Sequence, residues 1–181
     1  MLLSAGRVWE ELVVGIMKVA EIGTEHRAAI HGVVSAAFGR PDEADLVRQL
    51  RDDGEAVLEL AAFEGDTVLG HILFSALAVD PATLRVAALA PVSVVPTHQN
   101  QGIGSALIRE GLARCAAQGF DACAVLGDPD YYKRFGFGLD AARTLQSVYS
   151  GHAYQALEFK PGALAGGLWR VTYPKAFGGS H

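Results

Sequence analysis

One short segment, Gln99-Asn100-Gln101-Gly102-Ile103-Gly104, constrains the fold of this chain more than any other. It follows an apolar, strand-like run and precedes residues 105–118, whose apolar positions recur at helical spacing. The start of a helix carries unpaired N–H groups and the positive end of the helix dipole, so it attracts anions such as phosphate. Glycine leaves room for a phosphate to approach the backbone. The segment therefore predicts an anion site at a helix start, and a glycine-rich turn without a ligand is the alternative.

The common nucleotide-binding motifs fit this segment poorly. A phosphate-binding loop of the form GxxxxGK[ST] needs a lysine after its second glycine, and none follows Gly104. A dinucleotide fingerprint of the form GxGxxG needs a third glycine, which is missing here. The strand-like runs before the segment also have the hairpin signals of antiparallel strands, whereas that fingerprint belongs to a parallel sheet.

The order of the predicted elements defines the fold class. Short strands are predicted at 18–22, 57–64, 67–79, 84–95, 121–126, 154–159 and 168–173. Helices are predicted at 25–37, 42–51, 105–118 and 129–135, with Thr24 capping the first and Asp128 capping the last. This order predicts an α/β fold with a mixed, mostly antiparallel central sheet flanked by helices.

One proline breaks the regularity of the predicted sheet. Pro91 lies inside the run 84–95, and proline has no N–H to donate to a neighbouring strand. We therefore expect this strand to be irregular or bulged at Pro91, shortly before the glycine-rich segment.

Length and composition limit the remaining possibilities. The chain has 181 residues, and we expect a single domain over 17–181 with residues 1–16 as an N-terminal extension. A net charge of −5 argues against nucleic-acid binding. The apolar run 12–17 is too short for a secretion signal or a membrane span, so cytoplasmic location is the default. Cys115 and Cys123 match no zinc-binding spacing, and we expect no metal site.

Three motifs together resemble one family. Gln99-x-x-Gly102-x-Gly104 is similar to the acetyl-CoA motif of the GNAT N-acetyltransferases. The runs GHILFS at 70–75 and GDPDYYKRFGF at 127–137 resemble a subgroup of bacterial predicted N-acetyltransferases. The resemblance covers residues 18–173 and is weakest after Gly138.

The resemblance implies acetyl-CoA as the cosubstrate and names the residues that would hold it. The pantetheine arm would pair with the strand Val92-Ser93-Val94, where a backbone N–H would polarise the thioester carbonyl. The pyrophosphate would contact the backbone of the motif, together with its first residue. These residues are Gln99, Gln101, Gly102, Ile103, Gly104 and Ser105.

The resemblance also implies a tyrosine that protonates the departing CoA thiolate. Tyr132 stands four residues before Gly136, at the family's spacing, and Tyr131 is the neighbouring candidate. Lys133 and Arg134 can reach a CoA phosphate or simply face solvent.

The general base is not identified by the sequence. The strand predicted at 121–126 has no glutamate, and its one acid is Asp121, at its start. Asp128, His71 and Ser93 are further candidates, and each also has an ordinary structural explanation.

The predicted activity is acetyl transfer to a primary amine by direct attack on the thioester. The acceptor would be an amine-bearing small molecule or a peptide, with no nucleic acid and no membrane involved. A homodimer is compatible with the sequence. The alternative is a non-catalytic acyl-CoA-binding sensor or regulator.

Overall fold

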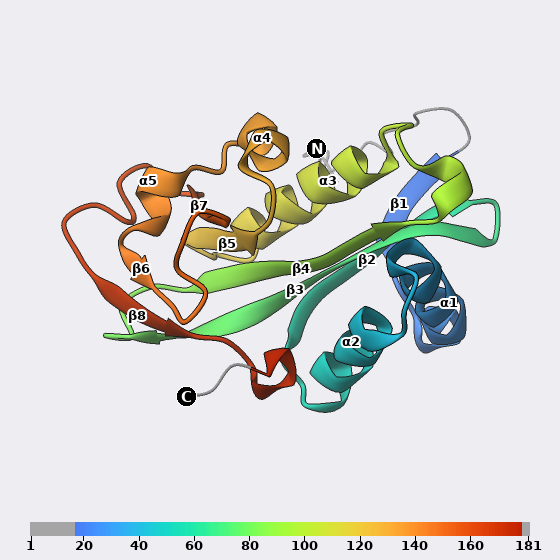
Figure 1. Ribbon diagram of the computed structural model, residues 1–181, viewed down its shortest axis with the longest axis horizontal. Helices are drawn as coiled ribbons and strands as arrows, with labels where there is room; N and C mark the ends of the chain where they lie inside the picture. Colours follow the sequence, from blue (N-terminus) through green and yellow to red (C-terminus); the bar gives the residue numbers. More distant parts are fainter. Residues whose placement is uncertain (1–16, 179–181) are drawn as a thin grey trace, which may run out of the picture.

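The computed structural model describes residues 17–178, and its centre is a twisted eight-stranded sheet with helices on both faces (Figure 1). The predicted N-terminal extension, residues 1–16, lies outside the described residues. The strands are β1 (Met17–Glu21), β2 (Ala56–Glu64), β3 (Thr67–Asp80), β4 (Val86–Val94), β5 (Ala122–Leu126), β6 (Leu145–Gln146), β7 (Tyr154–Glu158) and β8 (Trp169–Thr172).

The strand order confirms the predicted fold class. The main path runs β1-β2-β3-β4-β5-β7, and β8 pairs with β3 and β6 at one side. All pairs are antiparallel except β4–β5 and β6–β8, which are parallel. The sheet is therefore mixed and mostly antiparallel, as the order of elements predicted.

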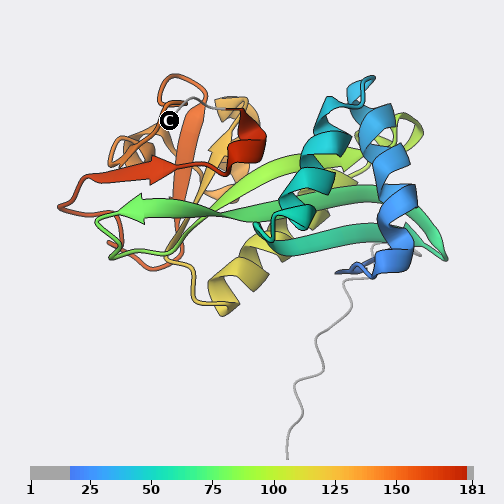
Figure 2. The same cartoon turned by 90° about the horizontal axis from the view of Figure 1, so that it is seen from below.

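The helices divide between the two faces of the sheet (Figure 2). The longer helices are α1 (Arg27–Phe38), α2 (Asp42–Asp52) and α3 (Ile103–Ala117), and the short ones are α4 (Pro129–Tyr132) and α5 (Leu139–Ala142). Alternate residues of β2 explain the layers, because successive strand side chains point to opposite faces. Leu58 and Leu60 pack in the core cluster that contains α3, whereas Ala61 and Phe63 pack with α1.

A β-bulge interrupts β4 where the sequence predicted one. Ile72 of β3 pairs with Val92, but Phe74, two residues on, pairs with Leu89, three residues away. The extra residue lies in the stretch that contains Pro91. The parallel pairing of β4 with β5 also ends at Leu89. Beyond this point the two strands separate, which leaves the edge of β4 open.

Two local predictions have opposite outcomes. The predicted cap at Thr24 is wrong, because Thr24 begins a 3₁₀ turn, Thr24–His26, and makes no side-chain cap. There the Gly23 N–H donates to His26 Nδ1 over 2.9 Å, and α1 begins one residue later. The cap at Asp128 is confirmed, because its Oδ1 accepts from the Asp130 N–H at 2.9 Å.

Close packing of α3 on the sheet gives a stability prediction. A Cβ built on Gly111 of α3 would lie 2.3 Å from Phe74 Cε2 of β3. Gly111→Ala is therefore expected to lower the free energy of unfolding by about 1–3 kcal/mol, the usual cost of overpacking. Gly32→Ala, on the exposed side of α1 with nothing near its Cβ, is the control and is expected to be neutral or stabilising. Urea unfolding measures both variants, and a Gly111→Ala protein as stable as the wild type contradicts this account.

Candidate active site

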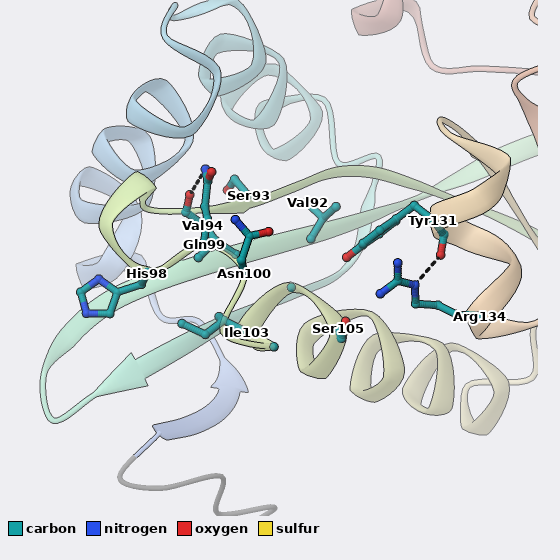
Figure 3. A pocket seen from close by; sticks show the side chains of 12 residues that line it. Val92, Ser93, Val94, His98, Gln99, Asn100, Ile103, Ser105, Tyr131 and Arg134 are labelled. Atoms are coloured by element: carbon teal, nitrogen blue, oxygen red, sulfur yellow. Dashed lines mark hydrogen bonds between the residues drawn. The ribbon is translucent and has the colours of Figure 1, made fainter.

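A pocket of about 470 Å³ lies between the open edge of β4 and the start of α3 (Figure 3). The third wall comes from α4 and the 3₁₀ turn Lys133–Phe135 that follows it. None of the described residues that line the pocket is acidic, although the chain as a whole carries a net charge of −5. They are Val92, Ser93, Val94, His98, Gln99, Asn100, Gly102, Ile103, Gly104, Ser105, Tyr131 and Arg134.

The loop before α3 leaves the first turn of that helix uncapped. Gln99 Nε2 donates to the Val94 carbonyl over 3.0 Å, which ties the loop back to the end of β4. Gly102 is the N-cap residue, with a φ of 87° and no side chain to cap the helix. The N–H groups of the first turn have no partner within the helix, so they are available to an anion in the pocket.

The second glycine of the motif faces across the pocket. A Cβ on Gly104 would lie 3.4 Å from Tyr131 Oη and 3.7 Å from Val94 Cγ2. The bare backbone of Gly104 therefore keeps the gap between α3 and β4 open. A phosphate-bearing, extended ligand fits this arrangement, with its anionic end at the helix start and its arm along β4.

The two adjacent tyrosines have different surroundings. Tyr131 lines the pocket, and its hydroxyl points toward β4 near Val92 (Figure 3). Its ring lies 4.5 Å from the Arg134 guanidinium carbon. Tyr132, the predicted proton donor, is only 9% exposed, does not line the pocket, and packs edge-on against Phe137. Burial raises the pKa of Tyr132 to about 12.

The pocket brings together most of the predicted cofactor residues. Gln101 is the exception, because its side chain turns away and its Nε2 donates to the Thr97 carbonyl over 3.4 Å. His98 and Asn100 were not predicted as cofactor residues; their only sequence signal is their position, Asn100 inside the motif and His98 just before it. Arg134 reaches the pocket, while Lys133 pairs with Asp130 at 2.6 Å.

The candidate bases lie in different places. Asp128 caps α4, and Asp121 is held by Lys160 at 2.6 Å just before β5. The hydrogen bond from Lys160, followed by that from the Arg85 N–H, lowers the pKa of Asp121. Neither acid lines the pocket. His71 is fully buried on β3, and Ser93 is buried on β4 in the pocket wall.

The end of the β4–β5 pairing and the uncapped helix start form a pocket at the edge of a mixed sheet whose shape suits an extended, phosphorylated ligand. A family model for the acetyltransferase (GNAT) domain matches residues 18–139. The chain therefore belongs to the GNAT family of N-acetyltransferases. Among the described residues, no helix is long and apolar enough to cross a membrane.

Individual relatives agree with this assignment. The uncharacterized N-acetyltransferase YhbS of Escherichia coli K12 is 34% identical over 151 residues, which cover 82% of this chain and 90% of that protein. The crystal structure of Escherichia coli YhbS in complex with CoA has a TM-score of 0.84 at 30% identity, over 91% of this chain and 93% of that one. A GNAT acetyltransferase from Brucella melitensis in complex with acetyl-CoA has a TM-score of 0.75 at 36% identity, over 89% and 97% of the two chains.

Proposed function

We propose that this protein transfers the acetyl group of acetyl-CoA to a primary amine by direct attack on the thioester. The observation that carries the proposal is one pocket in which the open edge of β4, the uncapped start of α3 and the Tyr131 hydroxyl meet. The complexes of YhbS with CoA and of the Brucella melitensis protein with acetyl-CoA support the choice of ligand.

The chain's own groups fit acetyl-CoA from end to end. The first-turn N–H groups of α3, with the backbone of Gln101 before them, would bind the pyrophosphate. Arg134 adds the positive charge that a phosphate needs. Val92, Ser93 and Val94 lie beyond the last β4–β5 pair, so their outer edge is free to pair with the amides of the pantetheine arm.

The open edge of β4 would also take part in the acetyl-transfer step. A backbone N–H from Val92 to Val94 would polarise the thioester carbonyl, as donors of an oxyanion hole do. A lysine-type amine has a pKa of about 10.4, so it must lose a proton before it attacks. The departing thiolate then takes a proton, and we assign that donor to Tyr131 rather than Tyr132, because Tyr131 is the tyrosine in the pocket wall.

A non-catalytic acyl-CoA sensor is the second candidate. It would need the same pocket, and the absence of a carboxylate among the described lining residues is the observation that favours it. A hydroxyl placed at the open strand edge has no evident use in a sensor. Turnover, rather than binding, therefore separates the two candidates.

The decisive experiment combines a binding and a turnover measurement on the full chain. Calorimetry is expected to detect CoA binding and no comparable binding of ATP, which carries phosphates but lacks the pantetheine arm. Release of CoA from acetyl-CoA is then followed with a panel of polyamines, amino acids, aminoglycosides and peptides with free N-termini. Steady release with at least one amine supports the enzyme. Binding without release from the whole panel favours the sensor, and a preference for ATP overturns both.

A further inference from the structure

A row of polar side chains crosses the sheet on the face covered by α1 and α2. Glu59 of β2, His71 of β3 and Ser93 of β4 are its members, and Arg51 reaches it from α2. The neighbours of Ser93 on β4, Val92 and Val94, pack instead in the core cluster that contains α3. Because strand side chains alternate, Ser93 points to the opposite face from these two valines.

A charged pair fixes one side of the His71 ring. His71 Nε2 lies 2.6 Å from Glu59 Oε1. The guanidinium of Arg51 forms an ion pair with the same carboxylate, and its Nε donates to Glu59 Oε2 over 2.9 Å. Glu59 and Arg51 are the charged groups that face His71 among the described residues. The carboxylate is thus anchored by Arg51 and in turn orients the imidazole.

The other side of the ring has no partner. His71 Nδ1 is buried and makes no hydrogen bond, and the same holds for Ser93 Oγ. His71 and Ser93 pair directly across β3 and β4, so their side chains lie side by side on one face. A buried polar atom without a partner destabilises the fold, so two of them on directly paired residues need a functional or structural reason.

The protonation states follow from the contacts. Burial is the largest effect on His71 and lowers its pKa, so the resting ring is neutral. Burial alone would raise the pKa of Glu59, but the hydrogen bonds from His71 and Arg51 outweigh it and the pKa is lowered. An ionised Glu59 accepts the Nε2–H of a neutral His71, which leaves Nδ1 as a free lone pair.

We propose that Ser93 and His71 form the proton-accepting relay of this enzyme. When the acceptor amine reaches Ser93 Oγ, the Ser93 hydroxyl turns to donate to His71 Nδ1, with which it makes no hydrogen bond at rest, and the ring receives the proton. The proposal rests on the acetyl transfer proposed above and supplies its missing base. Glu59 and Arg51 are positioning residues, which hold the ring and stabilise the imidazolium once it forms.

The proton count balances. The acceptor ammonium gives one proton to Ser93 Oγ as the Ser93 hydroxyl proton passes to His71 Nδ1. The neutral amine attacks the carbonyl carbon, the C–S bond breaks, and the second amine proton ends on the CoA sulfur by way of the tyrosine. His71 then returns its proton through Ser93 to water after the products leave. The sum is amide, CoA thiol and one released proton.

A purely structural role explains only half of the cluster. An ion pair that ties α2 to the sheet accounts for Arg51, Glu59 and the Nε2 side of His71. It does not account for the free Nδ1, or for a second polar atom without a partner, Ser93 Oγ, on the residue directly opposite His71 on β4. A second serine provides a matched comparison: Ser75 is on β3, on the same face as His71, fully buried and also without a partner for Oγ, but outside the pocket.

The test compares Ser93→Ala with Ser75→Ala in the full chain. With saturating acetyl-CoA and the best amine of the panel, kcat is measured from pH 6 to pH 10. Ser93→Ala is expected to lose about tenfold in kcat at pH 7, less than the roughly 100-fold or more that is usual for a proton-transfer group, because water can take the proton in its place. The loss should shrink as the pH approaches the pKa of the amine, because the acceptor then arrives already neutral. Ser75→Ala should follow the wild type throughout, and both variants should keep the wild-type Kd for CoA.

The outcomes separate the relay from the activity itself. Coincident profiles for Ser93→Ala and Ser75→Ala overturn the relay while acetyl transfer stands, and so does a loss in Ser93→Ala that is the same at every pH. A wild type that releases no CoA with any amine removes the proposed function and the relay with it. Independently of activity, ¹⁵N NMR of His71 is expected to find the Nε2–H tautomer at pH 7, and an Nδ1–H tautomer overturns the relay.

Discussion

Tyr131→Phe is expected to lower kcat about 100-fold, with a change of less than about threefold in the Kd for CoA, as for the loss of a positioned proton donor. The hydroxyl of Tyr131 points toward β4 near Val92, where the thioester sulfur would lie (Figure 3). Phenylalanine keeps the ring that packs against Arg134 and removes only the hydroxyl group. Steady-state kinetics of CoA release measure kcat, and calorimetry measures the Kd for CoA separately.

Tyr132→Phe is the matched control for this prediction, and its kcat is expected to stay within about threefold of the wild type. A phenol whose pKa is raised to about 12 by burial holds its proton more tightly than an ordinary tyrosine. Tyr132 is therefore the weaker donor as well as the more distant from the pocket. The reverse pattern, a large loss in Tyr132→Phe and none in Tyr131→Phe, would return the role to the residue four positions before Gly136.

The choice between the two tyrosines shows what sequence spacing leaves open. Successive residues of a helix point about 100° apart, so only one of the pair can face the pocket. That choice depends on Gly127, whose missing side chain makes room for the Tyr132 ring: a Cβ there would lie 2.5 Å from Tyr132 Cε2. Both residues lie in the run GDPDYYKRFGF, but the spacing of Tyr132 from Gly136 does not show which tyrosine ring fills the space beside Gly127.

Features with a local cause could be predicted well. The bulge of β4 near Pro91 follows from a missing N–H, and the cap at Asp128 from a side chain that reaches two residues ahead. The start of α3 without a side-chain cap likewise follows from a glycine placed just before an amphipathic helix. Each of these depends on residues that are neighbours in the chain.

The row Glu59, His71 and Ser93 could not be predicted in the same way. The turn at Gly65–Asp66 identifies a hairpin, but the pairing of β2 with β3 shifts between Ala62 and Phe63. A shift of one residue moves side chains to the other face of a sheet, so a row across three strands depends on the exact register. His71 and Ser93 were therefore separate candidates in the sequence and become one group only in the fold.

Gly104→Val is expected to weaken CoA binding at least tenfold, which corresponds to about 1.4 kcal/mol or more. The Cβ position of Gly104 faces both Tyr131 Oη and Val94 Cγ2, so a branched side chain there would project across the gap between α3 and β4. The ligand must pass through this gap to place its pyrophosphate at the helix start and its arm along the strand. Calorimetry measures the affinity, and urea unfolding checks that the variant is folded.

A graded series distinguishes blockage of the pocket from general damage to the helix. Gly104→Ala adds only the Cβ, which makes a close but tolerable contact, so its loss of affinity should be smaller than that of Gly104→Val. Gly102→Val acts differently, because its Cβ would meet open space while its φ of 87° strains any branched residue. It should therefore lose stability as well as affinity. Full affinity in both valine variants would mean that the loop does not hold the pyrophosphate, and the phosphates would then have to bind elsewhere along the pocket.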